Sequence, residues 1–512
     1  MQSLTNHIVP GVNVSITAPA PAISGVPSNI LGLVGSATWG PYNAIGLVSG
    51  PASYAQAYGL ITTSTYNLGT SVAIAAQIGA GVMHVVRVKG TSDAKAGVTM
   101  VDTAGTPANG LVLSAYYFGT SGNSIKAQFS AGTATGTYNL TIWSTALGIT
   151  EVFTNLSGTG NALWVAAAAA INNGQGYARG PSQLVTATAA ASTAAPSLAI
   201  FSLTGGADGT FTDDTIIGAP GASPTGIYVF DGSLINHLVA VGVTDEDTFG
   251  DICAFANTVP CVAYLQMVAG QSVSAMLTMA STLSIGNDDP QFPVHRVFGG
   301  DFALWNDTAN QQTRYVPINI AAAALAAVLQ PNESVVNKSL LPIIGTQKSA
   351  TGRKYTEAEM QQLTIANIDF VVAPGTKQRG DYYSFLNGRS FTDNMSLQFD
   401  NYQKLTNFIT VSIKDWANIF IGQLQTETVR EQAATRIRGF LNQLWRQSVI
   451  GNVENPSAPP YKVVINDTNN TPATVALGYM IANVQVAYLQ VIMNFTINYE
   501  GGALVVIPSQ AA

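Results

Sequence analysis

The sequence predicts a multidomain protein of mixed α/β and α+β class, and three observations lead to this prediction. The chain has 512 residues, 47% of them hydrophobic, which at roughly 150 residues a domain gives about three domains with sizeable cores. The stretch SVAIAAQIGAGVMHVVRV (71–88) reads as a helix followed by a β-branched strand, a pattern typical of α/β folds. At both ends of the chain, apolar and polar residues alternate as in a strand with one buried face. We therefore expect an α/β scaffold with an inserted β-rich domain, a C-terminal α+β domain and extended strand arms.

Residues 1–20 are predicted to form an N-terminal strand arm and spacer. The apolar residues that alternate with polar ones there are Val12, Val14 and Ile16. Because side chains on a strand alternate between its faces, this pattern predicts a strand with one buried face. The prolines that follow are Pro19, Pro21 and Pro27. Proline restricts φ and removes an N–H donor, so the strand is held away from the next domain by a stiff spacer.

Residues 489–512 are predicted to form the corresponding C-terminal strand and arm. The apolar positions of this strand are Leu489, Val491, Met493, Phe495 and Ile497. Before Ala487 the apolar residues fall on even positions, whereas from Leu489 they fall on odd positions. A bulge or break near Ala487–Tyr488 would cause this change and offset the last strand from the one before it.

Between the arms, residues 21–90 together with 206–354 predict the α/β scaffold, beginning with a buried strand at 30–34. Residues 91–205 have short strands separated by Gly, Thr and Ser, and an alanine-rich helix at 162–171. We expect this segment to be an inserted β-rich domain that faces outward, because insertions are tolerated on surfaces.

Residues 355–488 are predicted to form the C-terminal α+β assembly domain. Thr356 and Glu359 have the spacing of a capping box at a helix start. The stretch 415–452 predicts one long helix closed by Gly451, followed by a strand in YKVVIND. Its helical apolar stripe consists of Ile437, Phe440, Leu441, Leu444 and Trp445.

The low charge of the chain indicates that much of its surface is covered. Charged residues make up 10% of the sequence, against roughly 25% in typical soluble domains. Burial in lipid is one explanation, but no apolar run approaches the roughly 18 residues of a membrane helix, and the N-terminus lacks the features of a signal peptide. Burial in protein interfaces is the explanation we favour. The net charge of −7, without a basic patch, argues against nucleic-acid binding.

Motifs of common catalytic and cofactor sites are absent from the sequence. It contains no GxxxxGK[ST], GxSxG or HExxH motif. The acidic clusters at 213–215, 244–248 and 287–290 fit helix caps and turns better than a metal site. The histidines are His7, His84, His237 and His295, all separated in sequence, and we interpret them as core or surface groups. Cys253 and Cys261 match no zinc spacing and are interpreted as buried thiols. We therefore predict no enzyme, cofactor or metal.

One charged feature stands out in this charge-poor chain. The long C-terminal helix carries Arg430, Arg436, Arg438 and Arg446, against Glu427 and Glu431. One interpretation is a solvated helix face with partial compensation by the glutamates. The other is a docking face for an acidic partner.

The order of several motifs resembles the tail sheath family of contractile phage tails and related particles. The opening VPGVNVSI followed by ISGVPSNILGLVGSATWGPYN is similar to the start of that family, and FGTSGNSIKAQF, LTGGADGT and TGIYVFD follow in family order. GFLNQLWRQSVIGN followed by YKVVINDTNNTPATVALGYMIANVQVA resembles its C-terminal domain. The resemblance spans nearly the whole chain, and the order of the motifs carries it more than any single one.

The resemblance implies a structural subunit that polymerises helically around a tail tube and contracts to drive the tube through a cell envelope. It implies that both arms add strands to neighbouring subunits, and that the partners are further copies, the tail tube protein, and baseplate and tail terminator proteins. It implies a place in the virion tail after assembly in the host cytoplasm. In such a sheath we expect the four arginines to face the tube, because of their concentration in a charge-poor chain. Composition and charge predict no nucleic-acid partner and no membrane insertion. The alternatives are a subunit of a non-contractile fibre or surface layer, and an α/β hydrolase.

Overall fold

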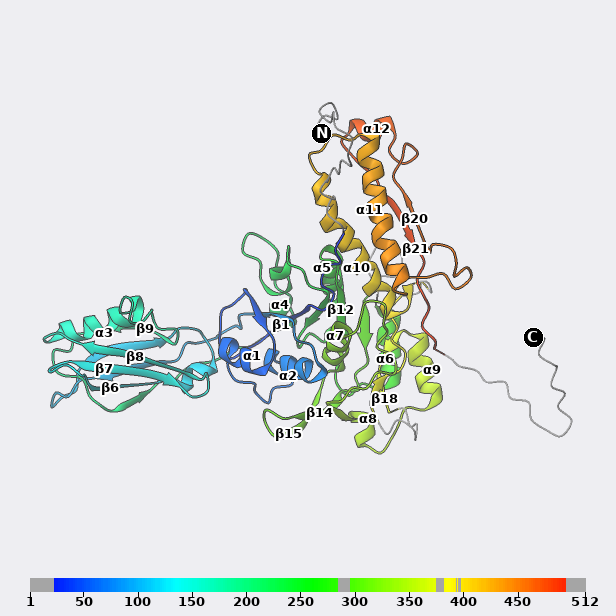
Figure 1. Cartoon of the computed structure of the whole chain (residues 1–512). Coiled ribbons are helices and arrows are strands. Elements are labelled where there is room, and N and C mark those ends of the chain that lie inside the picture. Colours follow the sequence, from blue (N-terminus) through cyan, green and yellow to red (C-terminus); the bar gives the residue numbers. More distant parts are fainter. Residues whose placement is uncertain (1–22, 284–294, 374–381, 393, 395–396, 494–512) are drawn as a thin grey trace, which may run out of the picture. The chain divides into compact units, whose positions relative to one another are not determined.

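The computed structural model describes residues 23–283, 295–373, 382–392, 394 and 397–493 (Figure 1). These residues divide into two compact units, which are described separately below. We call residues 27–407, with 491–493, the core unit. We call residues 408–490, with 23–26, the helical unit.

A seven-stranded sheet forms the centre of the core unit. In sheet order its strands are β17 (Ile368–Asp369), β13 (Arg296–Phe298), β12 (Val262–Gln266), β11 (His237–Ala240), β1 (Leu31–Gly35), β3 (Met83–Arg87) and β2 (Ile45–Val48). All neighbours pair in parallel except β2, which is antiparallel to β3. β1 and β12 are buried at every position, as expected of parallel strands that are covered on both faces. The predicted strand at 30–34 and the helix–strand pair at 71–88 are both present.

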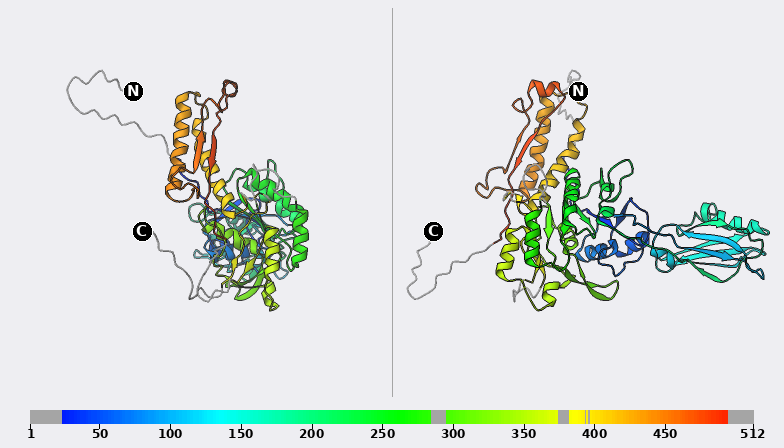
Figure 2. Two further views of the ribbon diagram at one scale, coloured as in Figure 1. Left: turned by 90° about the vertical axis from the view of Figure 1, so that its right-hand side faces the viewer. Right: turned by 180° about the vertical axis from the view of Figure 1, so that it is seen from behind.

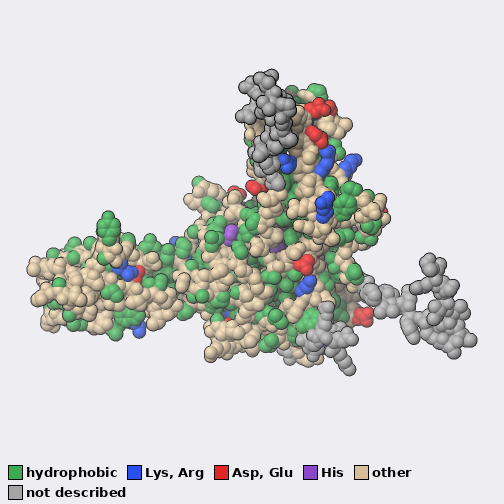
Figure 3. Space-filling model, viewed as in Figure 1, with side chains coloured by type: hydrophobic (Ala, Val, Ile, Leu, Met, Phe, Trp, Pro, Cys, Tyr) green, Lys and Arg blue, Asp and Glu red, His purple; other side chains and the backbone are tan. Residues whose placement is uncertain are grey.

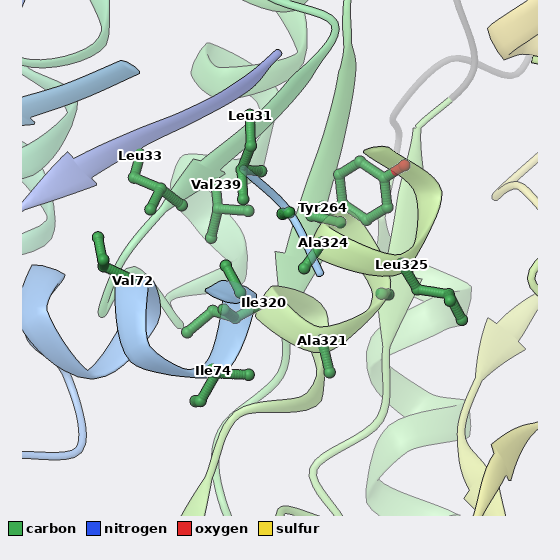
Figure 4. Close-up of a cluster of buried hydrophobic side chains, with 14 of the residues drawn as sticks. Leu31, Leu33, Val72, Ile74, Val239, Tyr264, Ile320, Ala321, Ala324 and Leu325 are labelled. Carbon is green, nitrogen blue, oxygen red and sulfur yellow. The ribbon is translucent and has the colours of Figure 1, made fainter. Parts of the chain in front are cut away.

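Two helices cover one face of this sheet. They are α2 (Leu68–Ile78) and α7 (Ile318–Val328), which lie side by side and pack against β1, β11 and β12 (Figure 4). Ten residues of α7, from Ile318 to Ala327, are buried. Six of these ten are alanines, whose small side chains let the helix approach both α2 and the sheet closely.

The opposite face packs against α5 (Phe249–Thr258), α6 (Val273–Thr282) and α9 (Glu357–Ile365). Phe249, Phe255 and Leu363 from these helices join the second hydrophobic cluster. The sheet is thus covered on both sides, which is the α/β arrangement that the sequence predicted. Within the described part of the chain, no helix combines the length and hydropathy of a membrane span.

The segment 97–202 forms a β-rich domain with two sheets and a helix (Figure 1). One sheet has the order β4 (Gly97–Val101), β5 (Asn109–Ala115) and β9 (Val185–Ala189). The other has the order β10 (Ile200–Ser202), β6 (Lys126–Ala131), β7 (Tyr138–Ser144) and β8 (Ile149–Leu156). The helix α3 (Asn161–Asn173) confirms the predicted alanine-rich helix, and its Trp164 packs edge-on against Phe129 in the domain's own core.

Smaller elements complete the core unit. Its other strands are β14 (Ala303–Asp307), β15 (Gln312–Val316), β16 (Ile343–Thr346), β18 (Val371–Val372) and β19 (Ser384–Phe385). Its other helices are α1 (Pro51–Tyr58), α4 (Asp213–Ile217) and α8 (Gln347–Ala350).

The helical unit contains α11 (Glu427–Arg446), the second part of α10 (Asp400–Ala417) and the short α12 (Pro472–Ala476). An antiparallel pair of strands, β20 (Tyr461–Val464) and β21 (Asn483–Val486), packs beside α11 (Figure 2). The rings of Phe408 in α10 and Phe440 in α11 lie 6.2 Å apart, centroid to centroid.

The predicted single helix at 415–452 is wrong, because the chain breaks it into parts. α10 ends at Ala417, and α11 begins after Thr426, whose side chain accepts a hydrogen bond from Val429 N. Between them Gly422 has φ of 85°, a left-handed conformation that glycine adopts without strain. At the other end Ser448, with φ of 57°, leaves the helical conformation before Gly451 is reached.

The division into units also differs from the expected boundary at 354/355. β17 pairs with β13 and thereby adds residues 368–369 to the large sheet. The division falls at 407/408, inside α10. A two-residue strand such as β17 has too little pattern to be recognised from sequence, and its partner lies about 70 residues earlier in the chain.

The capping box at the start of α9 is present as predicted and supports a stability prediction. Thr356 Oγ1 accepts from Glu359 N (3.2 Å), and Glu359 Oε2 accepts from Thr356 N (2.8 Å). We expect Thr356→Ala to lower the free energy of unfolding by about 1 kcal/mol in urea titrations. Gln361→Ala, at an exposed site in the same helix, is the control. An equal loss in both variants would contradict the cap.

The same box predicts a dependence on pH. The hydrogen bond from Thr356 N, followed by the bond from Lys348, lowers the pKa of Glu359 from 4.5 to about 2. A carboxyl whose folded pKa is depressed stabilises the fold above its unfolded pKa. This contribution is lost as pH falls through about 2. Glu359→Gln should therefore flatten the stability profile between pH 4.5 and about 2, measured by thermal unfolding.

Candidate assembly interface

Within the described residues, no further strand pairs with either outer edge of the β20–β21 sheet of the helical unit. Ala487 N donates to Pro460 O (2.7 Å), which sets the register of the pair. By the alternation of an antiparallel ladder, the peptide N–H and C=O groups of Tyr461 and Val463 then point away from β21. Those of Val484 and Val486 point away from β20 for the same reason. Within the described residues, the side chain that bonds the backbone of these strands is that of Asn469, at Val464 O beside the turn (2.8 Å).

One face of this small sheet is covered by α11. Val463 and Ile465 are buried, as are Ile437, Phe440 and Leu444 of α11. A two-stranded sheet with open edges is marginal in water, so packing on α11 stabilises it. The exposed edges are a template for pairing with another strand.

The helical unit also exposes large apolar side chains in the segments before α11 and after α12. Both segments lie at the end of the unit that carries α12 (Figure 1). Figure 3 shows hydrophobic side chains interspersed with charged and other ones on the described part of this unit. Ile421 and Leu424 precede α11, and Leu477 and Tyr479 follow α12, with exposed fractions between 62% and 85%. Gln425 Nε2 donates to Asn470 Oδ1 (3.3 Å) and ties the two segments together. Apolar side chains gathered at one end of a unit mark an interaction surface.

The four arginines of α11 do not form a single face. The guanidinium of Arg430 lies 2.7 Å from Asp467, with the Arg430 side chain 14% exposed, so it serves the packing of its own unit. Arg438 pairs with Glu431 (3.0 Å) on the exposed side of the helix. Arg446 is exposed and Arg436 is half-buried, and neither forms an ion pair within the described residues. Glu431 thus partly compensates the positive charge of Arg438, as one of the two interpretations expected. Arg430 pairs instead with Asp467, a partner that the sequence did not suggest.

The predicted arm strands are only partly within the described residues. Val12, Val14, Ile16, Phe495 and Ile497 lie outside them. Leu489, Val491 and Met493 are described, and the chain has no regular secondary structure from 487 to 493. The strand β21 ends at Val486, where the parity of the apolar residues changes. A strand needs a hydrogen-bonding partner, and among the described residues no strand pairs with 489–493.

The described residues that adjoin the two predicted arms contact the helical unit. Val26 N donates to Ser412 Oγ (3.1 Å), and a Cβ at Gly25 would lie 2.7 Å from the ring of Phe408. At the other end Gly451 N donates to Ala487 O (3.3 Å).

Other residues considered for chemistry have structural roles. His237 Nδ1 lies 2.9 Å from the Tyr264 hydroxyl, and burial lowers the pKa of His237 to about 3. His295 Nδ1 accepts from Ala263 N (3.1 Å). Burial raises the pKa of the Cys253 and Cys261 thiols, which are free.

The acidic clusters that the structure describes act as caps. Thr212 and Asp213 begin α4, and Asp213 Oδ2 accepts from Thr244 N and Asp245 N. The cluster at 287–290 and His7 lie outside the described residues. Within the residues that are described, no group of three metal-ligating side chains gathers.

Sequence reasoning missed a buried cluster of four charges in the core unit. Arg296 of β13 pairs with Asp369 of β17, and Lys404 of α10 lies 3.7 Å from Asp400. All four residues are at least 94% buried. Burial raises the pKa of Asp369 to about 6, against the opposing effect of Arg296. A charged residue inside an apolar strand, as in VHRVF, was the available signal.

No protein-family model and no curated protein sequence matches this chain. Solved structures do share its fold. The sheath tail protein of Desulfitobacterium hafniense aligns with a TM-score of 0.60 over 90% of this chain and 94% of its own, at 12% identity. The sheath tail protein Lin1278 of Listeria innocua aligns at 0.57 over 87% and 90%, also at 12% identity.

A third similar structure is the helical sheath of the anti-feeding prophage in its contracted state. It aligns with a TM-score of 0.53 over 96% of this chain and 99% of its own, at 12% identity. These structures are described as sheath proteins and not as enzymes. The chain therefore has, over nearly its whole length, the fold of the sheath proteins of contractile tails and injection systems.

Proposed function

We propose that this protein is the structural sheath subunit of a contractile tail. The observation that carries the proposal is the shared fold, which extends over about nine-tenths or more of both chains in the similar sheath structures. Many copies would wind helically around a tail tube and contract to drive it through a cell envelope. The further partners would be the tube, baseplate and terminator proteins. The protein would belong to the virion tail, assembled in the host cytoplasm, without nucleic-acid binding or membrane insertion.

The helical unit supports polymerisation by strand exchange. The outer edges of β20 and β21 have no strand partner among the residues that the structure describes. The patterns at 12–16 and 489–497 supply strands with one apolar face, which need a sheet to pair with. A strand added to such an edge gains main-chain hydrogen bonds, and its apolar face gives specificity. Covered surfaces in the polymer would also account for a charged fraction of 10%.

Two compact units joined through α10 suit a contractile subunit. Each unit has its own hydrophobic packing and can keep its internal structure while contacts between subunits exchange as rigid-body interfaces. The exchanged arms would persist as tethers during this change. The energy would be stored in the assembly, so that no nucleotide is required.

Electron microscopy of the purified protein tests the proposed function. We expect hollow helical tubes. Sheets or solid fibres would support the non-contractile alternative instead. A soluble monomer that stays monomeric at high concentration and with added tube protein would overturn both assembly functions.

The exposed arginines of α11 provide a second test. We expect Arg438→Glu with Arg446→Glu to weaken binding of the sheath to its tube, because both side chains are exposed and would repel an acidic partner. Pelleting of tubes with assembled sheath measures this at physiological salt. Arg436 stays a candidate for the same surface. Since Arg430 pairs with Asp467, Arg430→Glu should instead destabilise the helical unit. Unchanged tube binding by the double variant would contradict the docking role.

A further inference from the structure

The two sheets of the inserted domain have edges that a second chain could reach. β8 is the outer strand of one sheet and β9 the outer strand of the other. Thr154 on β8 and Thr186 and Thr188 on β9 are exposed. Both strands are rich in β-branched residues, as in ITEVF and VTATA, and neither contains lysine or proline. Such strands pair readily with strands of other chains.

Two side-chain amides occupy these edges. Asn172 Nδ2 donates to Ala187 O (2.7 Å), and Asn172 Oδ1 accepts from Ala187 N (3.0 Å). Gln175 Nε2 donates to Thr154 O (2.8 Å), and Gln175 Oε1 accepts from Thr154 N (2.9 Å). Each amide thus makes both hydrogen bonds that one residue of an added strand would make.

The end of α3 places the two amides. Asn172 lies in the last turn of α3, and Gln175 follows the helix after Gly174. Gly174 has φ of 80°, and a Cβ there would lie 2.5 Å from Arg179 O. A residue with a side chain would therefore disturb this turn. Beside Asn172, Ser182 Oγ accepts from Val185 N (3.1 Å) and so takes the next outward N–H of β9.

The other edges of the two sheets are covered by different means. Gly97 and Thr204 exchange hydrogen bonds of 2.8 and 3.1 Å, and Ser197 N donates to Val101 O (3.1 Å), so the chain itself covers β4. β10 has three residues. On each of β8 and β9 an amide thus takes the N–H and C=O of one edge residue, Thr154 and Ala187. The few charges of this domain include the buried Asp102 and Glu151.

We propose that Asn172 and Gln175 determine the specificity of assembly by closing the inserted domain to strand addition. Water could satisfy the backbone groups of the exposed Thr154, whereas Ala187 is buried, so that Asn172 also satisfies backbone groups that water reaches poorly. Both amides act on strand addition as well. Their consequence is that another chain finds no free N–H and C=O at these positions. The amides would thereby confine strand exchange to β20 and β21, and this part of the inference rests on the proposed function. Their effect on strand addition at β8 and β9 does not depend on it.

The test compares three double variants of the full chain. Asn172→Leu with Gln175→Met removes both bridges with side chains of similar size. Asn172→Asp with Gln175→Glu also removes the donated bonds but leaves charge on both edges, which opposes pairing. Asn173→Leu with Gln183→Met is the control, since both residues are exposed and no hydrogen bond of their side chains is found in the described part of the chain. Each variant is also made without residues 1–18, so that association through the N-terminal arm is removed.

Light scattering, hydrogen exchange and thermal unfolding provide the readouts. We expect faster exchange at Ala187 and Thr154 in the Leu/Met variant. The carboxylates of the Asp/Glu variant still accept hydrogen bonds from both N–H groups, so these should stay protected there. The Leu/Met variant should associate into dimers and larger species, whereas the Asp/Glu variant and the control should not. If both bridge variants associate equally, the association comes from partial unfolding of the domain and the inference is overturned. The inference is also overturned if neither variant associates. Tubes formed without residues 1–18 would contradict arm exchange, while the comparison among variants would still decide the role of the amides.

Discussion

Replacing Val14 with aspartate, or removing residues 1–18, is expected to leave a folded protein that no longer polymerises. Val14 belongs to the apolar face of the N-terminal strand pattern. An unpaired carboxylate placed against an apolar sheet costs several kcal/mol, and this cost recurs at every joint of the lattice. Light scattering and electron microscopy measure assembly, and circular dichroism reports the retained fold.

The opposite face of the same pattern supplies the control. Ser15→Asp puts the same charge on the polar face and should leave assembly nearly unchanged. Phe495→Asp and removal of 489–512 should act like the N-terminal changes, and removal of 501–512 should act more weakly. Normal tubes from Val14→Asp and from the truncated chain would show that contacts between folded domains carry the assembly.

The accepting sheet allows a matched experiment within the described residues. The N–H of Val484 points away from β20, so Val484→Pro removes a donor for an incoming strand and keeps the β20–β21 ladder. We expect this variant to fold and to assemble poorly. Gln485→Pro removes a donor inside the ladder and should destabilise the pair itself. Assembly of Val484→Pro equal to that of the unmodified protein would place the exchanged strand at the β20 edge.

Arg296→Met is expected to lower the free energy of unfolding by about 3–5 kcal/mol, because it leaves the buried carboxylate of Asp369 without its partner. Arg296 and Asp369 are both fully buried, and the guanidinium also lies 4.9 Å from the ring centroid of Phe298. Urea unfolding at pH 7 measures the change. Since the pKa of Asp369 is already raised by burial, the loss should shrink as pH falls and the carboxyl becomes protonated.

Two further variants test whether the lost stability comes from the unpaired buried charge. Arg296→Met combined with Asp369→Leu replaces both partners with apolar groups and should recover most of the lost stability. Arg438→Met breaks the exposed pair with Glu431 and should cost about 0–1 kcal/mol. If Arg296→Met unfolds at the same urea concentration as the unmodified protein, the buried pair does not stabilise the core unit.

Several elements of this fold could be predicted from sequence because their causes are local. The capping box of Thr356 and Glu359 spans three residues and forms as predicted. The stripe on α11 follows from helical periodicity, and Ile437, Phe440 and Leu441 are buried. The break before α11 also had local signals, in Gly422 and Thr426, which the strong stripe concealed.

The partners of the arginines could not be predicted in the same way. Arg430 pairs with Asp467 across the turn after β20, and Arg296 pairs with a residue 73 positions away. Nothing in the neighbouring sequence selects such a partner, since the pairing depends on how strands and helices meet after they pack. The amide bridges of Asn172 and Gln175 are of the same kind, because they join a helix end to the edges of two different sheets.

The sequence by itself determined the class of the fold, the local elements and the one-faced patterns at both ends of the chain. Periodicity, caps and prolines act over a few residues, so the local structure that they produce can be predicted without a tertiary structure. Only the tertiary structure decided that β17 completes the large sheet and that four charges share one core. It also decided that, among the described residues, the outer edges of β20 and β21 have no strand partner, while amides bridge one residue on each of β8 and β9. These features depend on which segments become neighbours, and that follows from packing the whole chain.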